Sequence, residues 1–359
     1  MAPILFLAAI FMLGSCGSRV NKDAGDLESS LKKGVVLVDY GEKQKVDVYI
    51  DGDLFTSYIY PPDLEKPVLF PVRSATGTVI TRGYPLDPRE GEVVDHPHHT
   101  GLWFNFGDVN GFDFWGNSKA IPADRKSHYG RILHTGVKRA ESRDEAGILE
   151  IAADWQVPGE GAGWHTLLQE QTLFKFSGDE DTRCIDRTTQ LTAQDVPVVF
   201  GDTKEGMYAI RLDRAFMFPS EEPLVFTDAN GIPRKEKILD NEGMNGQYLN
   251  SEGVEGLAVW GKRAVWCALS SNIGDEKITI AIFDHPDNYN HPTYWHARGY
   301  GLFSVNNLGA AAFDKDAEPS RLELAPGESI VFKHRVYITS WHHATAEELD
   351  AQFAEFSEN

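Results

Sequence analysis

The string HPHHTGLWF at residues 96–104 holds the densest group of side chains that could do chemistry. Histidine titrates near neutral pH, so it can transfer a proton, bind a metal ion or satisfy polar groups at a strand edge. On an extended segment, His96 and His98 point to one side and His99 points to the other. We predict an acid or base role for His98 or His99, and we keep a metal site and a structural role as alternatives.

A second string, DHPDNYNHPTYWHARGYGLFSVNNLG at residues 284–309, is equally rich in polar and aromatic side chains. Together the two strings hold half of the twelve histidines of the chain. A histidine before proline can simply satisfy a turn backbone, so we select the part around His296 as a second candidate proton donor. The residues expected to bind the ligand are His96, Trp103, Asn105, Asp113, Trp115, Arg211, Trp295, Arg298 and Asn306.

Two glutamates could complete an acid–base pair with these histidines. Glu170 shares one side of an expected strand with apolar residues, and a carboxylate that faces a core has a raised pKa unless it is paired. The alternative for Glu170 is a buried ion pair with Arg187 or Arg211. Glu205 lies in a polar turn at 201–206 and could act as the base, or it could be part of a solvated loop.

Tryptophan side chains stand close to these polar residues along the chain. Flat aromatic rings contact the C–H faces of a sugar, while amides, carboxylates and arginine bind its hydroxyl groups. We therefore expect a carbohydrate-active protein, a hydrolase, lyase or epimerase-like enzyme that acts at a glycosidic or hemiacetal centre. Arg211 and Arg298 suit an acidic or oxidised sugar, whose binding should weaken as the pH rises through the histidine range.

Two other functions use the same residues. A non-catalytic glycan-binding protein would need Trp103 or Trp295 as a platform for the sugar. A metalloprotein would join His296 to His96 and His98 on copper or zinc. We predict no cofactor, and a divalent metal held by histidines is the remaining alternative.

The elements that must position these residues are predicted to be strands. From residue 35 onward, short apolar or alternating runs are separated by Gly, Pro, Asp and Asn, which indicates strands and turns. Residues 148–157 alternate clearly between apolar and polar side chains. Many strands without a βαβ alternation or a repeat predict an all-β protein, a large antiparallel β-sandwich.

Helical spacing is convincing only near the C-terminus. Thr345 can begin a capping box there, and the apolar stripe that follows consists of Leu349, Phe353 and Phe356. We predict one short helix that packs against a sheet. Because no change in composition follows residue 33, residues 34–359 are expected to form a single sandwich domain.

The N-terminal residues 1–15, MAPILFLAAIFMLGS, carry no charged side chain. Their apolar run is shorter than the ~20 residues needed to cross a bilayer and is typical of an export signal. Leu13-Gly14-Ser15-Cys16 is similar to the bacterial lipobox, in which the cysteine becomes the lipidated first residue. We predict a lipoprotein signal peptide at 1–15, a polar tether at 16–33, and a lipid anchor in the cell envelope, at the outer membrane on its periplasmic or surface face.

The charge balance excludes one class of partner. The chain has 34 Lys and Arg against 54 Asp and Glu, a formal net charge of -20, and so repels the phosphates of nucleic acid. No other apolar run approaches a membrane-spanning length, so membrane contact is expected only through the N-terminal lipid. Besides Cys16 the chain has Cys184 and Cys267, which could form a disulfide or remain two buried thiols.

The strings HPHHTGLWF and HPTYWHARGYGLF, with EGMYAIRL and VWGKRAVWC, resemble the PmoA-like family of secreted bacterial proteins over residues 35–341. The label "methane oxygenase PmoA" does not suit this chain, because the copper methane monooxygenase subunit of that name is a polytopic membrane protein. The resemblance implies a domain of unknown function, common in glycan-degrading bacteria, with a shape similar to the galactose-mutarotase-like supersandwich. In that fold a histidine and a carboxylate flank the sugar, which by role would be His98 or His99 with Glu205 or Glu170.

Overall fold

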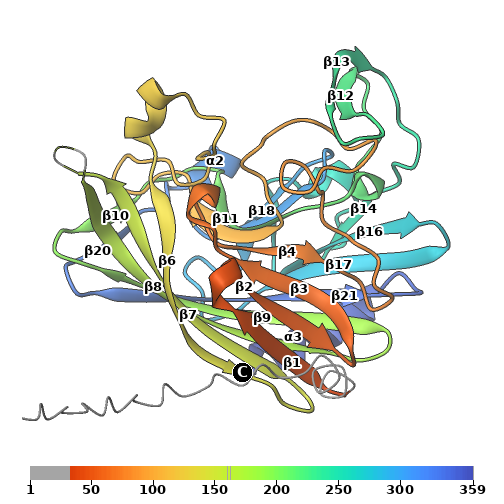
Figure 1. The fold of residues 1–359 in the computed structure, drawn as a ribbon, viewed down its shortest axis with the longest axis horizontal. Helices are drawn as coiled ribbons and strands as arrows, with labels where there is room; N and C mark the ends of the chain where they lie inside the picture. The colour runs from red at the N-terminus through yellow and green to blue at the C-terminus, as the bar shows by residue number, and fades with distance from the viewer. Residues whose placement is uncertain (1–32, 160, 162, 359) are drawn as a thin grey trace, which may run out of the picture.

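Segments in which apolar and polar residues alternate form the strands of two large sheets that pack face to face (Figure 1). The structure is a computed structural model, and it describes residues 33–159, 161 and 163–358. The predicted signal peptide at 1–15, the lipidation site Cys16 and nearly all of the predicted tether lie outside the described residues. Every ladder between the named strands is antiparallel, which confirms the predicted all-β sandwich.

The first sheet has nine strands, in the spatial order β1 (Val35–Tyr40), β2 (Lys45–Ile50), β3 (Asp53–Ile59), β4 (Val68–Val72), β5 (Leu102–Phe106), β11 (Gly206–Arg211), β19 (Leu302–Asn306), β18 (Thr293–Ala297) and β15 (Arg263–Ala264). The second has eight, in the order β14 (Gln247–Asn250), β16 (Trp266–Ile273), β17 (Glu276–Asp284), β21 (Ser329–Thr339), β9 (Thr182–Ala193), β8 (Trp164–Gly178), β7 (Gly147–Pro158) and β6 (Arg131–Glu141).

Smaller elements connect these sheets. Two separate strand pairs are β10 (Val198–Phe200) with β20 (Leu322–Leu324), and β12 (Leu224–Thr227) with β13 (Pro233–Ile238), the latter a hairpin that projects away from the sheets in Figure 1. The 3₁₀ turns are η1 (Gly41–Lys43), η2 (Pro62–Leu64), η3 (Ala123–His128), η4 (Arg214–Phe216) and η5 (Gly256–Val259). The helices are α2 (Ala310–Phe313) and α3 (Ala346–Ser357).

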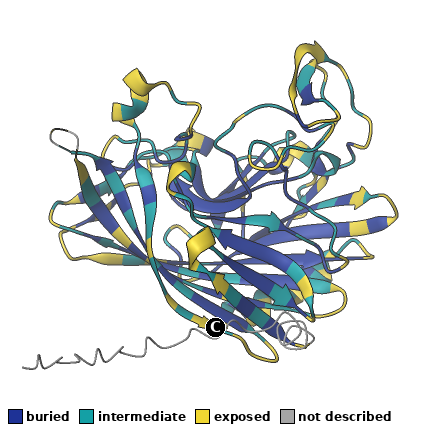
Figure 2. Cartoon of the chain, viewed as in Figure 1, coloured by how far each residue is buried: buried dark blue, intermediate teal, exposed yellow. Residues whose placement is uncertain are grey.

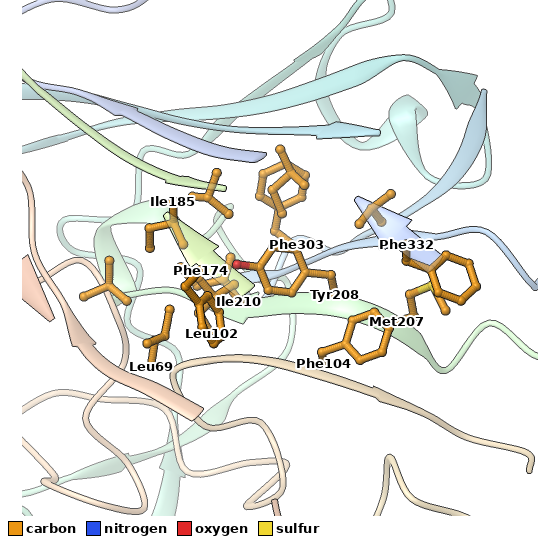
Figure 3. Close-up of a cluster of buried hydrophobic side chains, with 14 of the residues drawn as sticks. Leu69, Leu102, Phe104, Phe174, Ile185, Met207, Tyr208, Ile210, Phe303 and Phe332 are labelled. Atoms are coloured by element: carbon orange, nitrogen blue, oxygen red, sulfur yellow. The ribbon is translucent and has the colours of Figure 1, made fainter. Parts of the chain in front are cut away.

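The main core lies between the two sheets, where apolar side chains from both meet (Figure 3). Phe104 and Ile210 come from the nine-stranded sheet, and Phe174 and Phe332 come from the eight-stranded sheet. Burial of one large apolar side chain stabilises a fold by roughly 1.5–3 kcal/mol. In Figure 2 the buried residues, in dark blue, run along the strands of both sheets.

The alternation predicted for residues 148–157 is present in β7, where every second side chain is buried in the core. The predicted C-terminal helix is α3, which begins after Thr345, whose side chain accepts a hydrogen bond from the backbone N–H of Glu348 at 3.2 Å. Leu349 and Phe356 pack against the far side of the eight-stranded sheet, beside Trp266. Among the described residues, no helix is long and apolar enough to cross a membrane.

Candidate functional site

One row of side chains crosses the outer face of the nine-stranded sheet, opposite the core. The strand register pairs Trp103 of β5 with Ala209 of β11, Ala209 with Ser304 of β19, and Ser304 with His296 of β18. Two small side chains thus lie between two large ones, which leaves room above the middle of the sheet. Trp115 packs there, with ring centroids 5.3 Å from Trp103 and 6.4 Å from His296.

A cavity of about 560 Å³ lies above this row. Its walls are formed by His96, His98, His99, Asp113, Trp115, Gly116, Ile121, Tyr129, Lys204, Glu205, His296, Arg298 and Tyr300. The structure therefore brings together four residues that the sequence placed in three separate segments, namely His98, Glu205, His296 and Arg298. We refer to this space as the histidine cavity.

The three histidines of the first string lie on a turn and not on an extended segment. The backbone N–H of His99 donates to the carbonyl of His96 at 2.9 Å, and His96 has a left-handed φ of 39°. Arg82 fixes this turn by donating to the backbone carbonyls of Asp95, His96 and His99, each at 3.1 Å. The prediction that His99 points away from the other two is therefore wrong, because a turn replaces the alternation of a strand.

Four aromatic rings stack in one column along this wall. The centroid of Tyr300 lies 5.0 Å from that of His96, His96 lies 4.8 Å from His99, and His99 lies 5.4 Å from Trp103, with interplanar angles of 9°, 2° and 21°. The centroids of Tyr300 and His99 are also only 6.4 Å apart, so the four rings form one compact group. His99 is buried within this column, and its Nε2 has no hydrogen-bond partner among the described residues.

Arg211 supports the column from behind and does not line the histidine cavity. It is buried, its guanidinium lies over the Tyr300 ring at 4.8 Å, and its Nη2 pairs with the Asp95 carboxylate at 2.7 Å. Although burial opposes the change, Arg211 and Arg82 hold the pKa of the Asp95 carboxyl well below its usual range. The prediction that Arg211 binds a substrate carboxylate is therefore not supported, because Arg211 already pairs with Asp95 and does not line the cavity.

The candidate proton-transfer histidines are both uncharged near neutral pH. Burial lowers the pKa of His98 to about 3, with Lys66 and His96 adding to the effect. Burial also lowers the pKa of His296 to about 4, although the nearby Glu205 opposes this. A neutral imidazole can accept a proton but is not a charged donor. The pKa of His99 is likewise lowered well below its usual value by burial.

Glu205 stands on a short loop that other residues hold in place. Asn306, buried on β19, donates from Nδ2 to the carbonyl of Thr203 at 2.9 Å. Lys204 Nζ donates to Glu205 Oε1 at 2.7 Å. Gly107 lies against the loop so closely that a Cβ at this position would be 2.7 Å from the Cβ of Glu205. Asn306 thus positions the loop and does not line the cavity.

Asp113 and Trp115 reach the cavity from the loop after β5. Asp113 Oδ1 accepts a hydrogen bond from the backbone N–H of Gly116 at 2.8 Å. Burial raises the pKa of the Asp113 carboxyl, and Glu205 adds to the increase. Asn105 supports the loop from below, because it donates to the carbonyl of Phe114 at 2.7 Å and accepts from the Trp103 indole at 3.0 Å.

Besides Arg211, Asn105 and Asn306, three further predicted site residues lie away from the histidine cavity or beneath it. Glu170 is buried between the sheets and pairs with Arg187 at 2.6 Å, so the ion-pair alternative describes it and its predicted catalytic role is not supported. Trp295 points into the core, where its indole donates to the carbonyl of Ala264 at 3.1 Å. Trp103 is fully buried under His99. Neither tryptophan offers a free face to a sugar.

Three residues of the site were not singled out from the sequence. Tyr300 forms the end of the ring column, Asp95 pairs with the two buried arginines, and Lys66 donates from Nζ to the carbonyl of His98 at 2.8 Å. Burial lowers the pKa of Lys66 to about 7, although Asp113 and Glu65 oppose the shift. A tyrosine between two glycines was a visible signal for Tyr300, but nothing in the sequence marks Lys66.

The metal alternative needs three ligands around one point. In the described part of the chain, no group of three or more His, Cys, Asp or Glu side chains is arranged to hold a metal ion. The Nδ1 atom of His296 is buried and has no hydrogen-bond partner among those same residues. Cys184 and Cys267 are both buried free thiols, which is the second of the two arrangements expected for them.

Three solved structures are similar to this chain at low sequence identity. An α-galactosidase from Lactobacillus brevis is 10% identical over 90% of this chain and 41% of that chain, with a TM-score of 0.41. A galactose mutarotase-like protein from Clostridium acetobutylicum is 10% identical over 86% of this chain and 98% of that chain, with a TM-score of 0.35. A galactose mutarotase related enzyme from Lactobacillus acidophilus is 8% identical over 87% and 98%, with a TM-score of 0.30.

This chain thus spans about two fifths of the length of that α-galactosidase. No curated protein matches the sequence. The motifs predicted a domain of unknown function, and a family model that covers residues 45–354 confirms this. The PmoA-like label and the lipid anchor are not part of that match and stay predictions. The chain belongs to the family of unknown function DUF6807.

Proposed function

We propose that the histidine cavity binds a sugar ring and that the protein moves protons at the hemiacetal or glycosidic centre of that ring. The observation that carries this proposal is the convergence of His98, His296, Glu205 and Arg298 on one cavity of about 560 Å³. That volume falls within the range of ~300–1,000 Å³ that is usual for small-molecule sites. The partly exposed ring of Tyr300 on the cavity wall is of the kind that contacts the C–H face of a sugar.

The protonation states assign the roles. His98 and His296 have lowered pKa values of about 3 and about 4, so each acts as a proton acceptor near neutral pH, where we had expected a donor. We assign the donor role to a carboxyl group, and we choose Asp113 because burial shifts its pKa in the direction that favours the protonated form. Glu205, next to both Asp113 and His296, is the second carboxyl that faces the reacting centre.

Arg298 is the reason why we propose an acidic or oxidised sugar as the ligand. It lines the cavity with its guanidinium over the Tyr300 ring at 5.6 Å. Unlike Arg211, it has no carboxylate within ion-pair distance among the described residues. A carboxylate on the sugar could therefore pair with Arg298 bidentately.

The test compares the full-length wild type with a His98→Ala/His296→Ala double variant on a panel of neutral and acidic sugars and glycosides. Exchange between anomers is followed by NMR, and products are identified by mass spectrometry. General acid–base groups contribute about 10²–10⁴-fold to a rate, so we expect a loss of this size in the double variant. Identical product profiles and rates in both proteins would remove the catalytic assignment.

A matched control is His165→Ala, which changes a partly exposed histidine at the start of β8 that does not line the cavity. It should leave the rate unchanged. A wild type that binds sugars tightly but converts none of them would instead be the non-catalytic glycan-binding protein considered above. Placement of the protein on a lipid anchor in the cell envelope remains part of the proposal, because residues 1–32 lie outside the described chain.

A further inference from the structure

A second cavity of about 550 Å³ adjoins the histidine cavity. The two share the side chains of Arg298 and Tyr300, which form the partition between them. The second cavity is lined mainly by Met217, Phe218, Leu224, Leu257 and Trp260. No histidine lines it, so its chemistry differs from that of its neighbour. We refer to it as the apolar cavity.

The walls of the apolar cavity are fixed by packing outside it. Phe218 stacks on Tyr248 with centroids 5.6 Å apart and an interplanar angle of 14°. Trp260 meets the edge of Phe313 at 5.5 Å. The side chain of Leu257 is 50% exposed although it lines the cavity. When a ligand covers a preformed apolar wall that includes a half-exposed leucine, the removal of that apolar surface from water favours binding.

Apart from Arg298 and Tyr300, which form the partition, the polar side chains of this cavity are few. Asp95 is neutralised by Arg82 and Arg211. Ser220 donates from Oγ to the carbonyl of Glu222 at 2.9 Å. The Nε1 atom of Trp260 is buried and has no hydrogen-bond partner among the described residues. A second sugar would leave many hydroxyl groups unpaired here, which is costly, whereas a flat ring with one oxygen would not.

The partition keeps the two cavities distinct but adjacent. The Tyr300 ring is held by His96 at 5.0 Å and by the guanidinium of Arg211 at 4.8 Å. Arg298 extends over the same ring. A ligand that occupies both cavities therefore has to pass an edge made of one phenol and one guanidinium.

We propose that the ligand has two parts, a sugar in the histidine cavity and an aromatic aglycone in the apolar cavity, which makes it an aryl glycoside. This inference rests on the proposed function, because the sugar part is assigned there. The aglycone lies against Phe218, Leu257 and the ring of Trp260. The apolar cavity thus selects the aglycone, while the histidine cavity selects the sugar.

The experiment measures the affinity of the full-length protein for matched methyl and phenyl glycosides of glucose, galactose and glucuronic acid by titration calorimetry. We expect at least one phenyl glycoside to bind about tenfold more tightly than its methyl partner, a gain that corresponds to about 1.4 kcal/mol. In a Leu257→Ser variant this gain should fall by about threefold or more, while the affinity for the methyl glycoside should not change.

The control is Leu239→Ser, which changes a leucine that is 60% exposed and lies outside both cavities. It should leave both affinities unchanged. Methyl glycosides that bind without any gain from the phenyl group, or a gain that Leu257→Ser does not reduce, would overturn the aglycone site and leave the proposed function standing. If no glycoside of either kind binds, both the proposed function and this inference fail.

Discussion

Burial sets the chemistry of individual residues in the histidine cavity. His98 and His296 lie where a positive charge is poorly solvated, and Lys66 adds repulsion at His98. Both imidazoles are therefore neutral over the pH range in which a free histidine titrates. The sequence led us to expect that ligand binding weakens as the pH rises through the usual histidine range. Because His98 and His296 are already neutral there, their change of charge is expected only at more acidic pH.

We predict that kcat/KM varies little between about pH 5 and pH 8 on account of these histidines and falls as the pH drops through about 4, where His296 becomes protonated. The direction follows from the lowered pKa, because a neutral acceptor is lost when it gains a proton. A pH–rate profile of the wild type measures this. A decrease in rate between pH 7 and pH 6, with a histidine-like midpoint, would contradict it.

Lys66 offers a second test of the same electrostatics. Its charge helps to lower the pKa of His98 to about 3, so Lys66→Met should raise the pKa of His98, while the acid limit set by His296 moves only if the pKa of His98 rises above about 4. The control is Lys119→Met, which removes an exposed lysine that pairs with Asp63 at 2.5 Å. Isotope-labelled histidine spectra recorded against pH give the pKa directly. An unchanged acid limit together with an unchanged His98 pKa would show that Lys66 acts only through its hydrogen bond.

Residue types alone could identify much of this cavity. Two histidine-rich strings and one polar turn supplied His98, His296, Arg298 and Glu205, and all four meet in the structure. The error at Trp295 has a simple physical origin. The alternation of side chains along a strand shows that Trp295 and His296 face opposite sides of the sheet. It does not show which of the two sides is the core.

At the scale of elements, loops and not strands decide which polar side chains face the cavity. The turn held by Arg82 and the loop held by Asn306 carry side chains whose direction depends on hydrogen bonds between distant segments. Such contacts leave no periodic pattern in the sequence. The alternating strands and the C-terminal helix do leave one, which explains why the sandwich and α3 could be predicted while the positions of His99 and Glu205 could not.

The loop that carries Glu205 can be tested through Gly107. In a Gly107→Ala variant the new Cβ would lie 2.7 Å from the Cβ of Glu205, so the loop has to move. We expect a stability loss of about 1–3 kcal/mol from overpacking and a fall in kcat of up to about 100-fold from misplacement of the carboxylate. Denaturant melts and initial rates measure the two effects separately.

The matched control is Gly136→Ala on β6, where the nearest atom to a new Cβ is Lys138 Nζ at 4.0 Å. It should preserve both stability and rate. A Gly107→Ala protein with the wild-type rate would show that the exact position of Glu205 does not matter for turnover.

At the scale of the whole molecule, the strongly acidic body is not expected to help the predicted lipid anchor to hold the protein at a membrane. The net charge of -20 disfavours contact with anionic lipid, so attachment depends on acylation of Cys16. The remaining thiols cannot substitute for it, because Cys184 and Cys267 are buried and burial raises the pKa of each.

We predict that Cys16→Ser moves the protein from the detergent phase to the aqueous phase in a detergent-partition assay and abolishes incorporation of labelled fatty acid. Cys184→Ser, the same change at a buried site, should retain both properties. Labelled fatty acid on the Cys16→Ser protein would refute the assignment of the anchor to this cysteine.

The alternation along β18 links folding to function. Trp295 faces the core and His296 faces the histidine cavity, one residue apart. A slip of this strand by one residue would exchange the two faces, placing an imidazole in the core and an indole in the cavity. Ligand binding is therefore a direct readout of native strand register, and a bound ligand would select correctly paired molecules over mispaired ones during folding.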